Sequence, residues 1–502
     1  MIYDIAIIGG GITGITTASL FKKESPRSKI IIFEKNKFLG GLAGTEKIDN
    51  YFFDSVYLFP EIGKFLNYLS IEYKPYKYTD FIFRYINAEE TNQWSIDIPY
   101  ETDKLKVHLS KQFPEESKSI NQFINQSLKL NKGFSNLKTK FNLIDLLKLF
   151  FRSNLLLSNL NKNLKDYLES FNFMDKNLIK VLSALSGLAN LPPEKLNALI
   201  SIVGFSSLQR GAYRQKYIFN EVIDEFIKKL YKSEVQIILG NNVETINREN
   251  SIFKIILKNN DIYYSRKIIS TINTFNIFQK IVSKDIIPKR FLNKIKNLVF
   301  SHSAFIIRLI VKNYSIKYPV DIGQLLFYCG DNAFAELYNL ANQDKSILDP
   351  GRFHFALSVR EQKQKDHYSM ELLSIPVSYN YWRSIYNSGD IRYKKEIKIW
   401  ESFFIDKLKK FFDKNIERKI ILKKIYTPID LEKNFNLFKG SIYDMSYIKT
   451  QSGLHRIMFK TPVKNFYHLK MVHGIYGSIF QSFLFVDYIM KGKINNYKYK
   501  FD

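Results

Sequence analysis

The N-terminal stretch most constrains the fold, because it combines a buried strand, a glycine turn, a helix and an acid in that order. Ile5–Ile8 is a continuous apolar run, typical of a buried parallel strand, and Gly9-Gly10-Gly11-Ile12-Thr13-Gly14 follows it with G-x-G-x-x-G spacing. A helix to about Glu24 and a strand over residues 29–33 then lead to Glu34. This order predicts a dinucleotide-binding α/β unit.

Each position of this unit has a physical reason. Gly9 permits a sharp bend, Gly11 lets the backbone approach a pyrophosphate, and Gly14 allows close packing of helix on strand. The helix N-terminus presents unpaired N–H groups to the phosphates. Glu34 stands where an acid accepts hydrogen bonds from an adenosine ribose. The competing interpretation is a glycine-rich turn in some other α/β unit.

A second glycine segment indicates which dinucleotide is bound. After Glu34, the sequence continues with Gly40-Gly41 and Gly44-Thr45, and then with Tyr51-Phe52-Phe53-Asp54. This arrangement resembles the FAD-dependent amine oxidase and phytoene desaturase superfamily, in which a Gly-Gly segment and then an aspartate follow the acid. No second G-x-G-x-x-G follows a later strand, so no separate nicotinamide-binding domain is expected.

The resemblance extends to the middle and the end of the chain. Residues 206–273 are similar to the family segment that returns to the nucleotide domain, and Val243 matches the valine whose backbone contacts the adenine. Tyr426–Glu432, Gly440–Tyr443 and Thr461–Tyr467 look like the closing segment of phytoene desaturases, carotenoid isomerases and retinol saturases. Within the superfamily, the chain therefore resembles the carotenoid branch.

The closing segment departs from the family pattern at one place. Lys470 and Met471 stand where the family normally has glycine followed by a small or acidic residue, so an expected acid near the flavin ribityl chain is missing. Gly474 and Gly477 still precede an apolar helical run, whose N-terminus could stabilise negative charge on reduced flavin. The alternative is a core helix that makes no cofactor contact.

The resemblance implies an α/β fold: a discontinuous Rossmann-like FAD-binding domain with an inserted α+β substrate-binding domain. The FAD-binding segments are expected at residues 1–75, 205–275 and 425–502, and the substrate domain at 76–204, mostly helical, and at 276–424. Non-covalent FAD is expected, and no metal. The FAD contacts that the resemblance implies are Gly9, Gly11, Ile12, Thr13, Gly14, Glu34, Lys35, Gly40, Gly41, Leu42, Val243, Gly474 and Gly477.

The implied activity is that of an FAD-dependent oxidoreductase acting on an apolar, isoprenoid or carotenoid-like substrate, by desaturation, saturation or isomerisation of carbon–carbon bonds. No catalytic side chain can be assigned, since the flavin supplies the chemistry. Two alternatives stay open. One is amine or protoporphyrinogen oxidase chemistry, and the other is a flavin-free prenyl-binding protein of the Rab escort and GDP-dissociation-inhibitor type.

Composition bears on location and partners. The 75 Lys and Arg residues against 48 Asp and Glu give a net charge of +27, which favours an anionic membrane surface, although a compositional bias of the genome would also produce it. No arginine-rich block or RNA-binding signature indicates nucleic acid. Cys329 is the only cysteine, as expected in a reducing cytoplasm. Residues 141–160 form the most apolar helical candidate, either a core helix or a site of peripheral membrane contact.

Overall fold

In the computed structural model, the described residues are 1–54, 59–77, 81–90, 93–135, 158–159, 161–184, 189–208, 211, 213–215, 218–313, 324–452, 455–457, 459–470, 474–492 and 494. The apolar helix expected at residues 141–160, apart from residues 158 and 159, lies outside them. So do Met471 and His473.

A five-stranded parallel sheet forms the dinucleotide-binding part. Its strands, in the order β10-β3-β2-β14-β20, are β10 (Gln236–Leu239), β3 (Ile30–Glu34), β2 (Ile5–Ile8), β14 (Ile268–Ser270) and β20 (Phe466–His468). Three separate segments of the chain supply these strands. Because neighbouring strands are all parallel, their carboxyl ends meet at one edge of the sheet, where open α/β sheets bind ligands.

Side-chain alternation builds a layer on each face of this sheet. Ile5 and Ile7 pack with α1 (Ile12–Glu24), α10 (Asn220–Lys232) and α17 (Gly474–Ile489). Ala6 and Ile8 face a second sheet in the order β1-β13-β12-β11. That sheet consists of β1 (Ile2–Tyr3), β13 (Ile262–Ser265), β12 (Ile252–Leu257) and β11 (Val243–Glu249). Both faces of β2 are thereby buried, which is why its sequence is uninterrupted in apolar residues.

A seven-stranded sheet forms the second part of the molecule, in the order β19-β15-β18-β17-β16-β7-β8. Its strands are β19 (Ile420–Tyr426), β15 (Ser303–Lys312), β18 (His367–Val377), β17 (Phe353–Glu361), β16 (Gln324–Cys329), β7 (Phe81–Asn87) and β8 (Trp94–Pro99). The β7–β8 hairpin comes from the first insertion and joins β16 in parallel register, so both insertions build one sheet.

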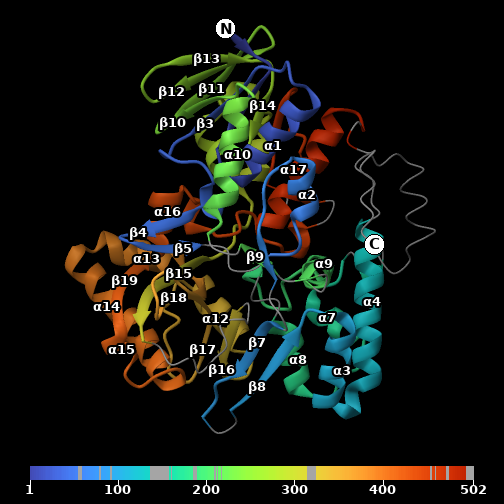
Figure 1. Cartoon of the computed structure of the whole chain (residues 1–502), viewed down its shortest axis with the longest axis vertical. Coiled ribbons are helices and arrows are strands. Elements are labelled where there is room, and N and C mark those ends of the chain that lie inside the picture. Colours follow the sequence, from blue (N-terminus) through green and yellow to red (C-terminus); the bar gives the residue numbers. More distant parts are fainter. Residues whose placement is uncertain are drawn as a thin grey trace.

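Helices cover both faces of this sheet (Figure 1). The helices of the first insertion cover one face: α3 (Thr102–Gln112), α4 (Ser117–Ser135), α7 (Leu164–Glu169), α8 (Lys176–Ser183) and α9 (Ala198–Leu208). The other face packs against α13 (Tyr379–Asn387), α14 (Asp390–Phe411) and α15 (Ile416–Lys419). α12 (Ala333–Asn342) and α16 (Pro428–Phe435) contribute side chains to the hydrophobic cores on both faces of the sheet.

Short elements connect the two parts. The β4 (Thr45–Ile48) and β5 (Tyr51–Asp54) hairpin follows the second glycine segment. The remaining elements are α2 (Gly63–Tyr68), β6 (Pro75–Lys77), β9 (Tyr213–Gln215) and α11 (Lys289–Lys296). The chain is therefore an α/β protein with a Rossmann-like unit and a large inserted α+β region. Among the described helices, none has the length and hydropathy needed to cross a bilayer.

Candidate functional site

The glycine turn after β2 has the geometry that its sequence predicts. Gly9 adopts a φ of +108°, and a Cβ there would lie 2.6 Å from Thr271 Oγ1. A Cβ on Gly14 would lie 2.1 Å from the Gly9 carbonyl oxygen. Both glycines are thus required by the backbone itself, the first for the bend and the second for the packing of α1 against the turn.

Gly11 differs from its neighbours because its side is open. A Cβ on Gly11 would have no heavy atom nearer than 3.9 Å, whereas a Cβ on Gly10 would lie 2.3 Å from Leu39 Cδ2. Gly11 is also the N-cap of α1, and no side chain caps the N–H groups of the first turn. An open glycine beside uncapped N–H groups fits a pyrophosphate, which needs close backbone approach and donors.

The second glycine segment lies directly against the first. The Gly40 N–H donates to the Gly10 carbonyl over 2.9 Å, and a Cβ on Gly41 would lie 3.1 Å from Gly11 Cα. Gly40 and Gly41 have φ values of +110° and +58°. Leu42 follows and is partly exposed. The structure therefore brings the two predicted glycine segments together into one wall at the carboxyl edge of the sheet.

Glu34 ends β3 beside this wall. Its Oε2 accepts from the Gly10 N–H over 2.8 Å, and its Oε1 accepts from the Asn36 N–H over 2.9 Å. A carboxylate has about four acceptor positions, so two remain for a hydroxyl-bearing ligand such as a ribose. Lys35 is half-buried, and burial lowers the pKa of its ammonium group.

The adenine-side residue of the prediction lies at the same end of β3. The Gly240 N–H donates to the Asn36 carbonyl over 2.9 Å, which holds the loop before β11 next to Glu34. Val243 is the first residue of β11 and is buried between the two sheets. Its backbone is therefore close in the chain to a loop that meets the end of β3, as an adenine contact requires.

The predicted flavin-side glycines lie on another helix. Gly474 begins α17 with a φ of +74°, and a Cβ there would meet no atom within 4 Å among the described residues. Gly477 lies one turn further on. Ser482 donates from Oγ to the Thr13 carbonyl over 3.2 Å, so α17 packs beside the start of α1. Ile12 and Thr13 themselves are buried in the first turn of α1.

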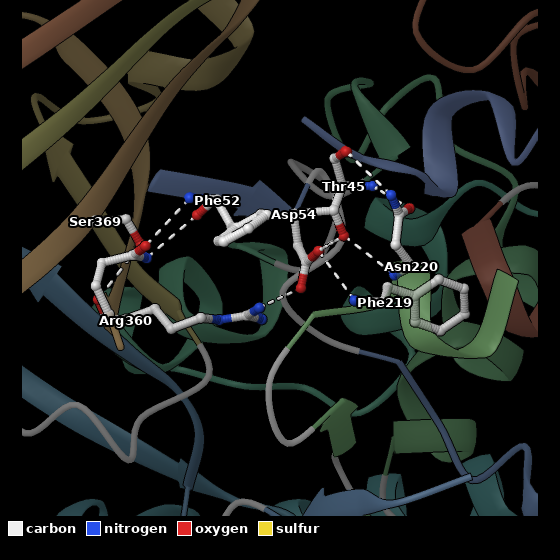
Figure 2. Close-up of polar contacts among 8 residues, drawn as sticks. Thr45, Phe52, Asp54, Phe219, Asn220, Arg360 and Ser369 are labelled. Carbon is white, nitrogen blue, oxygen red and sulfur yellow. Dashed lines mark hydrogen bonds and ion pairs between the residues drawn. The ribbon is translucent and has the colours of Figure 1, made fainter. Parts of the chain in front are cut away.

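The β4–β5 hairpin connects the second glycine segment to the seven-stranded sheet through Asp54 (Figure 2). The buried Asp54 carboxylate accepts from Thr45 Oγ1, from the Phe219 N–H over 3.1 Å and from the Arg360 guanidinium. Asn220 accepts from the Thr45 N–H over 2.8 Å and donates its own N–H to Thr45 Oγ1 over 3.1 Å. Hydrogen bonds with Asp54 and Asn220 therefore fix Thr45, which is one residue after Gly44.

A second buried charge group lies next to this one and was not predicted. Arg308 donates to Glu371 over 2.6 Å and also to Glu46, which accepts from the Tyr426 hydroxyl as well. Burial raises the pKa of Glu371, and the Arg308 charge opposes that rise. Glu371 is 63 residues from Arg308 in the chain and Glu46 is 262, so no local sequence pattern connects them.

The departure at Lys470 lies beside a buried acid. Asp444 accepts from the Thr274 N–H over 2.9 Å, and Thr274 Oγ1 shares a hydrogen bond of 2.9 Å with His468 Nε2. Burial lowers the pKa of Lys470, against the opposing charge of Asp444, and burial raises the pKa of Asp444. Burial, together with the Lys470 charge, lowers the pKa of His468 to about 3, so this imidazole is neutral.

A small apolar void of about 10 Å³, room for about one water molecule, lies in the core of the inserted region, between the seven-stranded sheet and the helices of the first insertion. No lining residue carries a formal charge at neutral pH. The lining residues are Phe83, Tyr85, Ile98, Leu105, Leu109, Val181, Leu182, Ala184, Phe205 and Leu326. Tyr85 belongs to an aromatic stack, with ring centroids 5.2 Å from Trp94 and 4.9 Å from Tyr328.

Comparisons with known proteins agree with this arrangement. Residues 7–57 match the family described as NAD(P)-binding Rossmann-like domain. The chain is 21% identical over 491 residues to the 1-hydroxycarotenoid 3,4-desaturase of a Flavobacterium species, covering 92% of this chain and 93% of that one. It is 20% identical over 309 residues to the inactive all-trans-retinol 13,14-reductase of Danio rerio, covering 56% of this chain and 49% of that one.

Solved structures share the fold over nearly the whole length. A putrescine oxidase double mutant superposes with a TM-score of 0.66 at 12% identity, covering 98% of this chain and 100% of that one. Cyclohexylamine oxidase from Brevibacterium oxydans gives a TM-score of 0.60 at 12% identity, covering 99% and 100%. At such identities these likenesses speak for the fold, and the carotenoid desaturase match adds full-length sequence similarity to it.

Proposed function

Since the chain is an oxidoreductase of the FAD-dependent amine oxidase and phytoene desaturase superfamily, we propose that it binds FAD non-covalently and acts on carbon–carbon bonds of an apolar, isoprenoid or carotenoid-like substrate. The observation that carries the cofactor assignment is the free space at Gly11. Gly40 and Gly41 lie beside Gly11, and no side chain caps the start of α1. The observation that favours an apolar substrate is the sequence similarity over nearly the whole length to 1-hydroxycarotenoid 3,4-desaturase.

The residues of the carboxyl edge would each hold one part of the cofactor. Gly11 and the first turn of α1 would bind the pyrophosphate, Glu34 the adenosine ribose, and the Val243 backbone the adenine. The Gly474 end of α17 would face the flavin with its N–H groups. When bound, the flavin supplies hydride transfer, and the protein contributes orientation and exclusion of water.

An apolar substrate is supported over an amine by sequence similarity. The relative with full-length similarity is named as a carotenoid desaturase. Amine or protoporphyrinogen oxidase chemistry is the second candidate, which the solved structures with this fold favour.

Absorption spectroscopy of the purified protein tests the cofactor assignment. We expect the near-ultraviolet and blue bands of oxidised flavin, with FAD released on denaturation because the attachment is non-covalent. A colourless protein that fails to bind added FAD would contradict the proposal and favour the flavin-free prenyl-binding alternative.

Anaerobic bleaching tests the substrate class. Mixing the oxidised protein with polyenes solubilised in detergent, and separately with primary amines and protoporphyrinogen, should bleach the flavin only with the polyene if the reaction is a desaturation. If no polyene bleaches it, chemically reduced protein should be reoxidised by a polyene when the reaction is a saturation. Bleaching by amines alone would transfer the assignment to the amine oxidases.

A polyene is nearly insoluble in water, so we propose that the protein collects it at an anionic membrane surface as a peripheral protein of the cytoplasm. The support is the net charge of +27, at about 1 kcal/mol for each basic residue close to the lipid. Flotation with anionic liposomes at low and high salt tests this. Protein that stays in the soluble fraction at low salt would contradict it.

A further inference from the structure

Two buried polar atoms at the carboxyl edge of the dinucleotide sheet have no hydrogen-bond partner among the described residues. They are Asp444 Oδ1 and Asn273 Nδ2. Both residues are deeply buried, with 4% of Asp444 and 5% of Asn273 exposed. A buried carboxylate oxygen and a buried amide N–H both cost free energy when unpaired, so each requires an explanation such as a ligand.

Their other atoms are fully engaged, which fixes both side chains. Asp444 Oδ2 accepts from the Thr274 N–H over 2.9 Å. Asn273 Oδ1 accepts from the N–H groups of Phe275 and Asn276 over 3.0 and 3.2 Å. In each residue, one polar atom therefore makes hydrogen bonds within the fold and the other is available to a ligand. The available atom is an acceptor on Asp444 and a donor on Asn273.

Both residues lie on the side of the sheet away from Glu34. The strand order is β3-β2-β14-β20, so the glycine turn after β2 lies between Glu34 and the ends of β14 and β20. Thr271, which follows β14, donates from Oγ1 to the Gly9 carbonyl over 3.0 Å. A dinucleotide with its ribose at Glu34 and its pyrophosphate at Gly11 continues toward the segment that follows Thr271.

The part of FAD that comes next after the pyrophosphate is the ribityl chain, whose hydroxyl groups both donate and accept. We infer that Asp444 Oδ1 and Asn273 Nδ2 bind this polyol chain. Asp444 would then replace the acid that is missing at Lys470. This inference rests on the proposed function, because it needs FAD in the site.

Lys470 and His468 complete the surroundings of this site. His468 is neutral and shares its hydrogen bond with Thr274, so it brings no charge to the cluster. Burial raises the pKa of the Asp444 carboxyl group, and the Lys470 charge opposes that rise. A carboxyl group keeps acceptor capacity in either protonation state, which suits it to hold a hydroxyl group.

Asp444→Asn tests the inference, because the amide oxygen can still accept from the Thr274 N–H while the free oxygen is replaced by a donor. FAD and ADP are titrated separately against the full chain, and ADP serves as the probe that lacks the ribityl chain. We expect FAD affinity to fall about tenfold or more, with ADP affinity unchanged. Asn273→Ser is the second variant, since its hydroxyl can still accept from the helix N–H groups, and it should shift FAD affinity in the same direction.

Ser374→Ala is the matched control. Ser374 Oγ is also buried without a partner among the described residues, but it lies on β18 of the other sheet, so neither affinity should change. Unchanged FAD affinity in Asp444→Asn and Asn273→Ser would overturn the inference, as would an equal loss of FAD and ADP affinity. Wild-type protein that binds no FAD would instead overturn the proposed function; if Asp444→Asn does not fold, Asn273→Ser alone decides.

Discussion

The glycine turn after β2 and the buried charge groups where the β4–β5 hairpin meets the seven-stranded sheet hold the second glycine segment in place by different means. The turn uses backbone shape, since a Cβ on Gly9 or Gly14 would meet atoms at 2.6 and 2.1 Å. The interface uses charge, since Asp54 pairs with Arg360 across 306 residues of chain. The backbone shape of a short segment can be predicted from the sequence of that segment, whereas the charged contact exists only after the whole chain has folded.

The difference matters because the two regions meet at the second glycine segment. Gly40 and Gly41 contact Gly10 and Gly11 on one side, and Thr45 is fixed by the Asp54 group on the other. A disturbance of either region should therefore reach the candidate cofactor site, but with different consequences for stability.

The largest expected effect is on the charged side of this comparison. Arg360→Met leaves the Asp54 carboxylate buried without its cation, which should reduce the free energy of unfolding by about 3–5 kcal/mol. Chemical denaturation of the FAD-free protein measures this. Arg352→Met is the control, because Arg352 pairs with Glu336 and Asp349 while about half exposed, and should cost less than about 1 kcal/mol. Equal losses would show that burial of the Arg360 pair contributes nothing.

The next effect concerns backbone shape. Gly14→Ala places a methyl group against the Gly9 carbonyl and should cost about 1–3 kcal/mol of stability. Gly204→Ala in α9 is the matched change, because a Cβ there meets nothing within 4 Å and alanine favours helix by about 0.5–1 kcal/mol. Opposite shifts in the denaturation midpoint are expected; shifts of the same sign would mean that the turn tolerates a side chain.

Acid should weaken the dinucleotide-binding sheet and the seven-stranded sheet, because each buries a neutral histidine. Burial lowers the pKa of His354 in the seven-stranded sheet to about 4, and the pKa of His468 is lowered to about 3. The unfolded chain takes up these protons near pH 6.5 and the folded chain does not, so stability falls as pH drops from about 6.5 toward 4. The slope is about 1.4 kcal/mol per pH unit for each histidine.

Denaturation midpoints between pH 7 and 5.5 measure this slope. His354→Gln should flatten it by one proton, since the glutamine amide can still donate to the Ile375 carbonyl that His354 contacts now. A slope that is unchanged in this variant would show that His354 is already protonated in the folded protein.

The smallest effect on stability is expected at Gly11, the open member of the turn. Gly11→Ala should change the free energy of unfolding by less than about 0.5 kcal/mol, since its Cβ meets nothing within 3.9 Å. It should nevertheless weaken FAD binding, because the methyl group occupies the space assigned to the pyrophosphate. Glu34→Ala should weaken FAD by about 1.5–3 kcal/mol and also release the Gly10 N–H. FAD titration of both variants decides.

The sequence predicted the features that depend on residues close together in the chain better than those that depend on residues far apart. Ile5–Ile8, the turn and Glu34 form one local pattern, and the structure has each element where the pattern places it. The expected strands and helices of the inserted region also occur, but their order in the sheet could not be derived. That order depends on β7 pairing with β16, a backbone pairing between strands far apart in the sequence.

The same limit applies to the candidate site. Gly9, Gly11, Gly14, Gly40 and Gly41 converge as expected because short loops bring them together, and their role in binding FAD stays a prediction. Asp54 was noticed as a family feature, but Arg360 carries no motif and could not be assigned as its partner. A buried arginine within an apolar strand, as in β15 and β17, is the signal that could have indicated a buried carboxylate elsewhere.

The pairing of β7 with β16 also bears on how the protein is made. Roughly 240 residues separate the end of β7 from the start of β16, so a ribosome working at about 5–20 residues per second needs about 12–50 s to supply the partner. During that interval one edge of the β7–β8 hairpin has no strand beside it, and such an edge is prone to pair with another chain. The nascent protein should therefore depend on a chaperone, or on low expression rate, more strongly than its finished stability would indicate.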